Sequence, residues 1–279
     1  MRAVALFLLI VPLIQLGCSA SAPEVATPGS EKDPGRKVVE RMIDAHGGLE
    51  KWQSAPTVSF EIAVTPAKRP GRVVRETVEQ GSRRAYHDYL QEGSRMSWDG
   101  EKAWTENAKG DRSARFAARV NYYFMNLPWV AADPGVILGE PGTGKLWDEP
   151  ADYITVKMTF EHGVGDTPDD YYLLYIDPAS YLLKAAEFIV TFARQEPDPA
   201  RIILYEEYAT VDGLRVPVKT TLYWKQDRSL YGTRNVKDWS FREPFDESRM
   251  VMPPGAVLDT SSPLASPLTS PLTNEETAQ

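Results

Sequence analysis

Residues 139–146 read GEPGTGKL, and their spacing is that of a nucleotide-binding phosphate loop. Such a loop also needs a hydroxyl residue after its lysine and a helix that begins there, so that backbone N–H groups point at the phosphates. Here Leu146 follows Lys145, and residues 147–150 (WDEP) leave no room for a helix before the next predicted strand. We therefore interpret the octet as a loop between a helix and a sheet, and we expect no nucleotide partner.

His46 is the second candidate for chemistry. It lies at the end of the first predicted helix, on the apolar side, just before Gly47 and Gly48. A catalytic histidine needs a nucleophile or a carboxylate within reach, and the sequence supplies no convincing partner. We interpret His46 as a core or helix-capping histidine, and we keep it as a possible polar site residue.

Metal-binding spacing is absent from the sequence. His87 and His162 stand alone, and Cys18 is the only cysteine. The acidic stretch 165–170 (GDTPDD) lacks the glycine and glutamate positions of a calcium loop and is typical of a solvated hairpin tip. No nucleophile elbow is recognisable. We therefore expect no metal, no cofactor and no catalytic residue, and hence not an enzyme.

The net charge excludes one class of partner. The chain has 279 residues with 31 basic and 39 acidic side chains, so its formal charge is −8. A non-specific nucleic-acid binder needs a basic surface that displaces counterions from phosphates. We therefore expect no nucleic-acid partner.

The N-terminus has the pattern of an export signal. Residues 1–17 combine a short basic start with a fourteen-residue apolar run, which is too short for a confident membrane span. Cys18 follows directly. In this the N-terminus resembles that of bacterial lipoproteins, which carry their lipidated cysteine at this place. We predict lipid attachment at Cys18, and Ser19 after it favours the outer over the inner membrane. The alternative is a secreted protein cleaved near residues 19–21.

Composition also sets the limits of the folded part. Residues 18–34 are small, polar and proline-bearing, which is typical of a flexible tether. Residues 259–279 include SPLASPLTSPLT, which has no periodic apolar face and predicts a disordered tail. We therefore expect a single β-rich domain over residues 35–258.

Two helices are predicted in this domain. The first is capped by Asp33, starts with Pro34 and has one apolar face. The second runs from Asp111 to Pro128. Its apolar positions at helical spacing are Phe116, Ala117, Val120, Tyr123, Phe124 and Leu127. Arg112, Arg115 and Arg119 are expected to face away from that stripe.

Most of the rest alternates with a period of two, as strands with one buried face do. The clearest strands are residues 57–65, 152–161 and 214–224. Less regular strands are expected near residues 71–80, 83–91, 94–98, 102–106, 171–176, 182–193, 201–209 and 233–241. Asp99-Gly100 and Asp212-Gly213 suit tight hairpins. About ten strands joined in this way predict an antiparallel meander.

Three motifs carry a resemblance to a known family. They are SRMSWDGEKAWT (94–105), YYLLYIDPASYLLKAAEFIV (171–190) and YATVDGLRVPVKTTLYW (208–224). Together with AHGGLEKW (45–52), they resemble hairpins of the LolA/LolB-like lipoprotein-carrier superfamily. The resemblance implies a mainly β (α+β) fold, in which a strongly curved, unclosed antiparallel sheet covers an N-terminal and a mid-chain helix. It also implies an apolar cavity for acyl chains between the sheet and the helices.

Aromatic residues on inward faces fit such a cavity. The candidates are Trp52, Phe60, Trp98, Trp104, Phe124, Phe160, Phe188 and Trp224. We expect a monomeric, lipid-anchored envelope protein that binds an acyl chain, a lipid or a lipoprotein. Two alternatives stay open: an interaction protein whose core is filled, and a hydrolase that uses His46 as its base.

Overall fold

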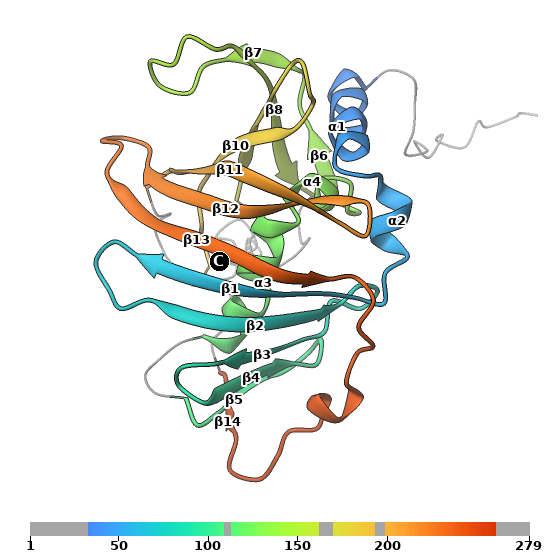
Figure 1. Ribbon diagram of the computed structural model, residues 1–279, viewed down its shortest axis with the longest axis vertical. Helices are drawn as coiled ribbons and strands as arrows, with labels where there is room; N and C mark the ends of the chain where they lie inside the picture. Colours follow the sequence, from blue (N-terminus) through green and yellow to red (C-terminus); the bar gives the residue numbers. More distant parts are fainter. Residues whose placement is uncertain (1–32, 109–112, 162–169, 193–198, 261–279) are drawn as a thin grey trace, which may run out of the picture. The chain divides into compact units, whose positions relative to one another are not determined.

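A computed structural model describes residues 33–108, 113–161, 170–192 and 199–260, to which all structural statements refer. Their strands form a single antiparallel sheet (Figure 1). The strands are β1 (Thr57–Pro66), β2 (Arg72–Glu79), β3 (Ala85–Tyr89), β4 (Ser94–Trp98), β5 (Ala103–Glu106), β6 (Val136–Leu138), β7 (Gly142–Gly144), β8 (Tyr153–Phe160), β9 (Tyr172–Ile176), β10 (Leu183–Phe188), β11 (Arg201–Val211), β12 (Leu214–Trp224), β13 (Leu230–Ser240) and β14 (Val257–Leu258).

The sheet is curved and open. Its order is β14-β5-β4-β3-β2-β1-β13-β12-β11-β10-β9-β8-β6, and β7 pairs with β8 off this path. The two ends of this order, β14 and β6, do not pair with each other, so the barrel is unclosed. The expected fold class is confirmed, but the expected number of strands was too low: the described part has 14 strands. The additional strands are short ones such as β6, β7 and β14, which are too brief to show a period of two.

The helices are α1 (Pro34–Ala45), α2 (Leu49–Gln53), α3 (Ala114–Met125) and α4 (Leu127–Val130), with a 3-10 turn η1 (Glu247–Met250). The curved sheet wraps around α3 (Figure 1). Within the described residues, none of the helices has the length and hydrophobicity that a membrane span requires.

Helix α1 begins and ends where the sequence predicts. The Asp33 side chain accepts a hydrogen bond from the backbone N–H of Arg36 at 3.0 Å, and Pro34 occupies the first turn, where its missing N–H has no cost. His46 is the C-cap, and Gly47 follows with a φ of 106°. That angle favours glycine, so the chain turns there without strain.

Helix α3 differs from its prediction at both ends. Ser113 caps it, accepting a hydrogen bond from the backbone N–H of Phe116 at 3.1 Å, whereas the expected start at Asp111 lies outside the described residues. The helix ends at Met125, and Pro128 does not terminate it but lies in the first turn of α4. Proline is tolerated in a first turn because the N–H of that position needs no helical partner.

The buried side of α3 is also rotated from the expected stripe. Its buried residues are Ala114, Ala118, Asn121, Tyr122, Phe124 and Met125. Of the expected stripe within α3, only Phe124 is fully buried, and Phe116, Val120 and Tyr123 are half-buried. The helix therefore packs on the sheet with one side and leaves part of its apolar surface incompletely covered.

Candidate ligand cavities beside helix α3

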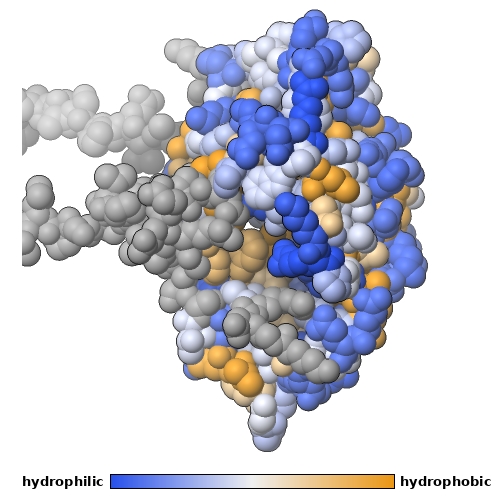
Figure 2. All heavy atoms as spheres, turned by 90° about the vertical axis from the view of Figure 1, so that its left-hand side faces the viewer, coloured by the Kyte–Doolittle hydropathy of each residue, from blue (hydrophilic) through white to orange (hydrophobic). Residues whose placement is uncertain are grey.

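Two cavities flank the incompletely covered side of α3. Cavity 1 has a volume of about 330 Å³ and cavity 2 of about 620 Å³. They share a wall, the common wall, which consists of Phe116, Val120, Phe124, Val190 and Phe192. One face of the molecule is visibly hollowed, with hydrophobic residues in its wall (Figure 2). The half-buried residues of α3 thus border space instead of packed side chains.

Cavity 1 lies between α3 and the strands around β8 and β9. Aromatic rings dominate it: Tyr123 lies 5.6 Å from Tyr172 and 6.3 Å from Phe160, and Phe124 lies 6.1 Å from Tyr172. Burial raises the pKa of both tyrosines far above the ordinary value, so neither hydroxyl ionises at neutral pH. The cavity offers flat apolar surface with a few neutral hydroxyl groups.

The charges of cavity 1 are of both signs. Arg83 forms an ion pair with Asp133 at 3.0 Å, and Asp170 also lines the cavity. Arg115 and Arg119 lie over the ring of Trp98 at 5.2 and 4.9 Å. The two arginines do not face away from the apolar stripe of α3 as expected, because both line this cavity together with Phe116. Their guanidinium groups stack on an aromatic face while their stems cover apolar surface.

Cavity 2 lies between α3 and the strands β10 to β13, and the charged residues in its described lining are of one sign. Arg69, Arg72, Arg201 and Arg234 all line it, and no Asp or Glu is among its described lining residues. Arg201 and Arg234 are only 6% and 8% exposed. Burial lowers the pKa of Arg234 to about 10, which still leaves this side chain charged at neutral pH.

A buried polar chain leads from cavity 2 beneath α3. Arg234 Nε donates to Asn121 Oδ1 at 3.3 Å, and Asn121 Nδ2 donates to Glu76 Oε1 at 2.7 Å. The other Glu76 oxygen lies 3.7 Å from Nε2 of His87, too far for a hydrogen bond. Burial raises the pKa of Glu76 to about 7 and lowers that of His87 to about 3, so His87 is neutral at neutral pH.

Sequence reasoning missed this polar chain, although one signal was present. Glu76 occupies an inward position of β2, between the buried Val74 and Val78. A carboxylate at an inward position of an alternating strand needs a partner. That partner is Asn121, which is 45 residues away in the sequence and could not be identified without the fold.

His46 is held by the backbone of two strands. Its Nδ1 donates to the carbonyl oxygen of Arg215 in β12 at 2.8 Å, and the N–H of Leu183 in β10 donates to Nε2 at 3.2 Å. The ring is fully buried, and it makes edge-to-face contacts with Trp129 and Tyr208, whose ring centres lie 5.7 and 5.1 Å away. Burial lowers its pKa to about 4. Both nitrogens are thus occupied by backbone groups, and His46 lines neither cavity.

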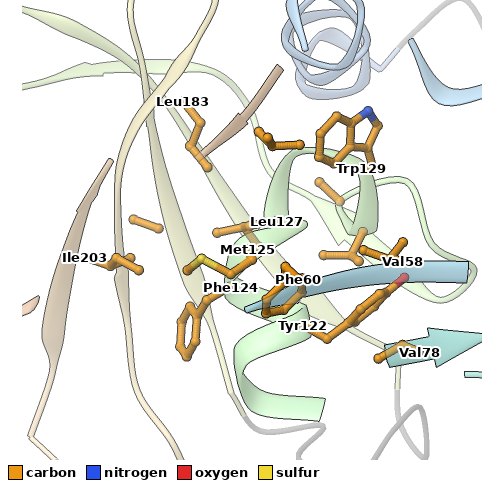
Figure 3. Close-up of a cluster of buried hydrophobic side chains, with 14 of the residues drawn as sticks. Val58, Phe60, Val78, Tyr122, Phe124, Met125, Leu127, Trp129, Leu183 and Ile203 are labelled. Carbon is orange, nitrogen blue, oxygen red and sulfur yellow. The ribbon is translucent and has the colours of Figure 1, made fainter. Parts of the chain in front are cut away.

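The eight predicted cavity aromatics fall into two groups. Phe124 lines both cavities, Phe160 lines cavity 1 and Phe188 lines cavity 2. The other five do not line these cavities: they are Trp52, Phe60, Trp98, Trp104 and Trp224. Trp52 is packed instead, with Trp129 stacked at 5.9 Å and Asn126 Oδ1 accepting its N–H at 2.9 Å. Figure 3 shows Phe60, Phe124 and Trp129 in this part of the core.

The octet of residues 139–146 contains the short strand β7 (Gly142–Gly144). Within it, β7 pairs with β8, with Thr143 opposite Ile154. Lys145 Nζ donates to the carbonyl oxygen of Pro150 at 2.8 Å and lies 3.2 Å from a carboxylate oxygen of Asp152. Turns and bends follow Lys145 in place of the helix that a phosphate loop requires.

Metal ligands are not grouped in the part of the chain that the structure describes, where no three His, Cys, Asp or Glu residues form a potential site. Asp170 is the one described residue of the acidic stretch, and its Oδ1 accepts hydrogen bonds from the N–H and the hydroxyl of Thr191, both at 2.8 Å. His162, Cys18 and the predicted signal peptide lie outside the described residues.

Comparisons with known proteins identify the fold. The model of a family of unknown function, DUF6503, matches residues 106–238. No curated protein matches the sequence. A LolA superfamily protein from Nitrosomonas europaea is similar in structure, with a TM-score of 0.50 and 12% identity over 78% of this chain and 98% of that chain. A DUF1329 family protein from Desulfovibrio piger has a TM-score of 0.52 and 9% identity over the same shares. The chain therefore has a LolA/LolB-like fold, as its hairpin motifs predicted.

Proposed function

We propose that this chain, which folds like the LolA superfamily, binds an apolar or acylated ligand in the two cavities beside α3, as a carrier or receptor does. The observation that carries the proposal is the common wall. Its residues on α3 keep apolar surface that the sheet does not cover, and cavities of about 330 and 620 Å³ adjoin them. Protein cores are normally close-packed, whereas ligand pockets have volumes of roughly 300–1,000 Å³ and mostly apolar walls.

Burial of an acyl chain would supply the affinity. Each methylene removed from water contributes about 0.8 kcal/mol. Phe116, Phe124 and Phe192 provide the flat apolar surface for such a chain, and the charged groups of the two cavities would orient its polar end. Binding without catalysis requires no nucleophile or general base at the cavities.

The two alternatives fit the geometry less well. A filled core, as an interaction protein without a ligand would have, is disfavoured by both cavities. A hydrolase with His46 as its base is disfavoured because backbone groups occupy both ring nitrogens and the ring is fully buried. A general base needs a nitrogen that can reach the substrate.

We further propose that the chain acts at the bacterial envelope as a monomer. The sequence of residues 1–17 directs export, and lipidation of Cys18 would anchor the chain to a membrane, with residues 18–34 as the tether. The outer membrane is favoured because Ser19 follows the cysteine. Without lipidation the protein would be secreted.

Filling the common wall tests the ligand proposal. Val120 is half-buried on α3 and lines both cavities, so Val120→Trp introduces a large side chain into both. Displacing two methylenes costs about 1.6 kcal/mol, which corresponds to a loss of affinity of more than tenfold. We expect this loss for a fluorescent fatty acid titrated into the full-length protein.

The matched control is Val38→Trp, which places the same side chain at a half-buried position of α1 that lines neither cavity. We expect it to bind the fatty acid as the wild type does. The proposal is wrong if the wild type does not bind the probe, or if Val120→Trp folds and binds it with unchanged affinity.

A further inference from the structure

We infer that the ligand is an anionic amphiphile, that cavity 2 holds its carboxylate or phosphate headgroup between buried arginines, and that its chain lies on the common wall. This inference deepens the proposed function and rests on it.

The first support is the imbalance of charge in cavity 2. Its described wall carries Arg69, Arg72, Arg201 and Arg234 and no acidic side chain, although the whole chain has a net charge of −8. Cavity 1 contains Asp133 and Asp170 beside its arginines. The arrangement is complementary to a negatively charged group.

The second support is the burial of Arg234, whose side chain is 8% exposed. A buried charge destabilises a protein unless it is paired. The hydrogen-bond partner of Arg234 is the amide oxygen of Asn121, which stands between its guanidinium and the carboxyl group of Glu76. A bound anion would supply charge compensation that a neutral amide does not provide.

The third support is the position of the cations around an aromatic pair. The rings of Phe124 and Phe188 are 4.5 Å apart. The Arg234 guanidinium carbon lies 5.6 Å from the Phe124 ring, and that of Arg201 lies 5.3 Å from the Phe188 ring. Two cations therefore border one continuous apolar surface. A molecule that carries an anionic group at the end of an apolar chain matches this arrangement.

Guanidinium groups also favour the proposed headgroup chemistry. Their planar, forked donors suit the oxygens of a carboxylate or a phosphate in a bidentate geometry. Because both headgroups have this chemistry, decanoate and decyl phosphate are compared to determine which headgroup binds more tightly. Inorganic phosphate without a chain serves as the third arm and separates an amphiphile site from a simple anion site.

The experiment is calorimetric titration of the full-length protein with single-chain ligands that differ only in their headgroup. Decanoate and decyl phosphate are anionic, decanol is neutral and decyltrimethylammonium is cationic. We expect at least one anionic ligand to bind about tenfold or more tighter than decanol. We expect the cationic ligand and inorganic phosphate alone to bind more weakly than that anionic ligand.

Two variants locate the preference. Arg234→Gln removes a buried charge and keeps a donor for Asn121, and Arg69→Gln removes a charge from an exposed position of the same cavity. We expect Arg234→Gln to reduce the preference for the anion at least fivefold and Arg69→Gln to reduce it about twofold, without weakening decanol. Lys68→Gln is the matched control, since Lys68 is exposed next to Arg69 and does not line cavity 2.

The outcomes separate this inference from the proposed function. If decanol binds as tightly as both anionic ligands, the inference is wrong and the proposed function stands. If no decyl ligand binds, both are wrong. Inorganic phosphate that binds as tightly as decyl phosphate would refute the amphiphile. If Arg234→Gln does not fold, Arg69→Gln decides: an effect equal to that of Lys68→Gln refutes the inference.

Discussion

Replacement of His46 by glutamine tests whether this histidine is structural. The imidazole joins the end of α1 to β10 and β12 through two hydrogen bonds to backbone groups. Glutamine carries a donor and an acceptor but lacks the fixed spacing of the ring. We therefore expect one buried backbone group to lose its partner at neutral pH, which costs about 1–3 kcal/mol of unfolding free energy.

The pH dependence gives the sharper test. Burial lowers the pKa of His46 from 6.5 to about 4 in the folded protein. Below pH 6.5 the unfolded chain binds a proton that the folded chain does not accept until about pH 4. The stability that His46 provides is therefore complete above pH 6.5 and is lost as the pH falls to about 4, by about 3 kcal/mol in total at 1.36 kcal/mol per pKa unit.

Urea unfolding followed by tryptophan fluorescence measures this effect. His87, with its pKa lowered to about 3, adds a loss of the same sign, and Glu76, with its pKa raised to about 7, opposes it. The relevant quantity is therefore the difference in unfolding free energy between wild type and His46→Gln at each pH. We expect the advantage of the wild type over His46→Gln to fall by about 3 kcal/mol between pH 7 and pH 4, which can reverse its sign.

A difference that stays constant over this range would refute the reasoning, because the folded-state pKa of His46 would then be ordinary. The affinity for the fluorescent fatty acid should not change, since His46 lines neither cavity. A variant with unaltered stability and impaired ligand binding or hydrolysis would instead make His46 a site residue.

Three further predictions address other parts of the chain. Metabolic labelling with a tagged palmitate should mark the wild type but not Cys18→Ser, and absence of label from both would contradict the lipid anchor. Glu76→Gln should gain about 3 kcal/mol relative to wild type as the pH rises from 4.5 to above 7. The reason is that a carboxyl group whose pKa in the folded protein is raised to about 7 stabilises the fold only at lower pH. If urea unfolding gives the same difference in unfolding free energy between variant and wild type at pH 4.5 and pH 8, this prediction is wrong. Gly35→Ala should destabilise by about 1–3 kcal/mol in urea unfolding despite the helix preference of alanine. An added Cβ would clash with the carbonyl oxygen of Gly139, whereas at the control Gly81→Ala it meets nothing within 4 Å. Equal stabilities of the two alanine variants would show that the backbone gives way.

Local patterns were enough to predict several elements of the fold. The capping residue Asp33, the alternation of the strands and the Asp212-Gly213 hairpin are all encoded within a few neighbouring residues, and each is found in the structure. Asp212 and Gly213 have φ values of 52° and 77°, which are the angles that the tight hairpin turn requires. Such features depend on backbone chemistry alone and therefore need no knowledge of distant contacts.

The candidate site was predictable only in part. Periodicity indicates which side chains point inward, but it does not indicate whether another side chain already occupies the space beside them. Trp52 points inward and is packed by Trp129 of α4, a helix that the sequence did not predict. Phe124 also points inward and borders two cavities. The distinction depends on where α3 and α4 lie in three dimensions.

The arginines of cavity 2 were missed for a related reason. Arg69, Arg201 and Arg234 come from segments that are more than 30 residues apart in the sequence, and each alone resembles an ordinary surface cation. Strand pairing brings their segments together, since β13 pairs with β1 and with β12, and β12 pairs with β11. The available signal was a charged residue at the start or in the interior of a predicted strand, next to residues that point inward. This signal does not identify the other residues that line the same cavity.

Buried polar groups explain why the cavities do not collapse. Asn121 and Tyr122 of α3 are bonded to Glu76 and Gln80 at the β2 side, at 2.7 and 2.9 Å, and the Tyr205 hydroxyl of β11 donates to the carbonyl oxygen of Phe124 at 2.7 Å. Each bond fixes α3 at a set distance from the sheet, since moving the helix would leave a buried polar group without a partner.

An apolar residue in place of Glu76 would remove the cost of burying a carboxyl group, and would also remove one bond that fixes the helix. Apolar contacts are not directional, so they would allow α3 to settle toward the sheet and fill the space beside it. The buried polar chain under α3 therefore lowers stability and keeps the common wall exposed to the cavities. We interpret it as the feature that keeps the space beside α3 open.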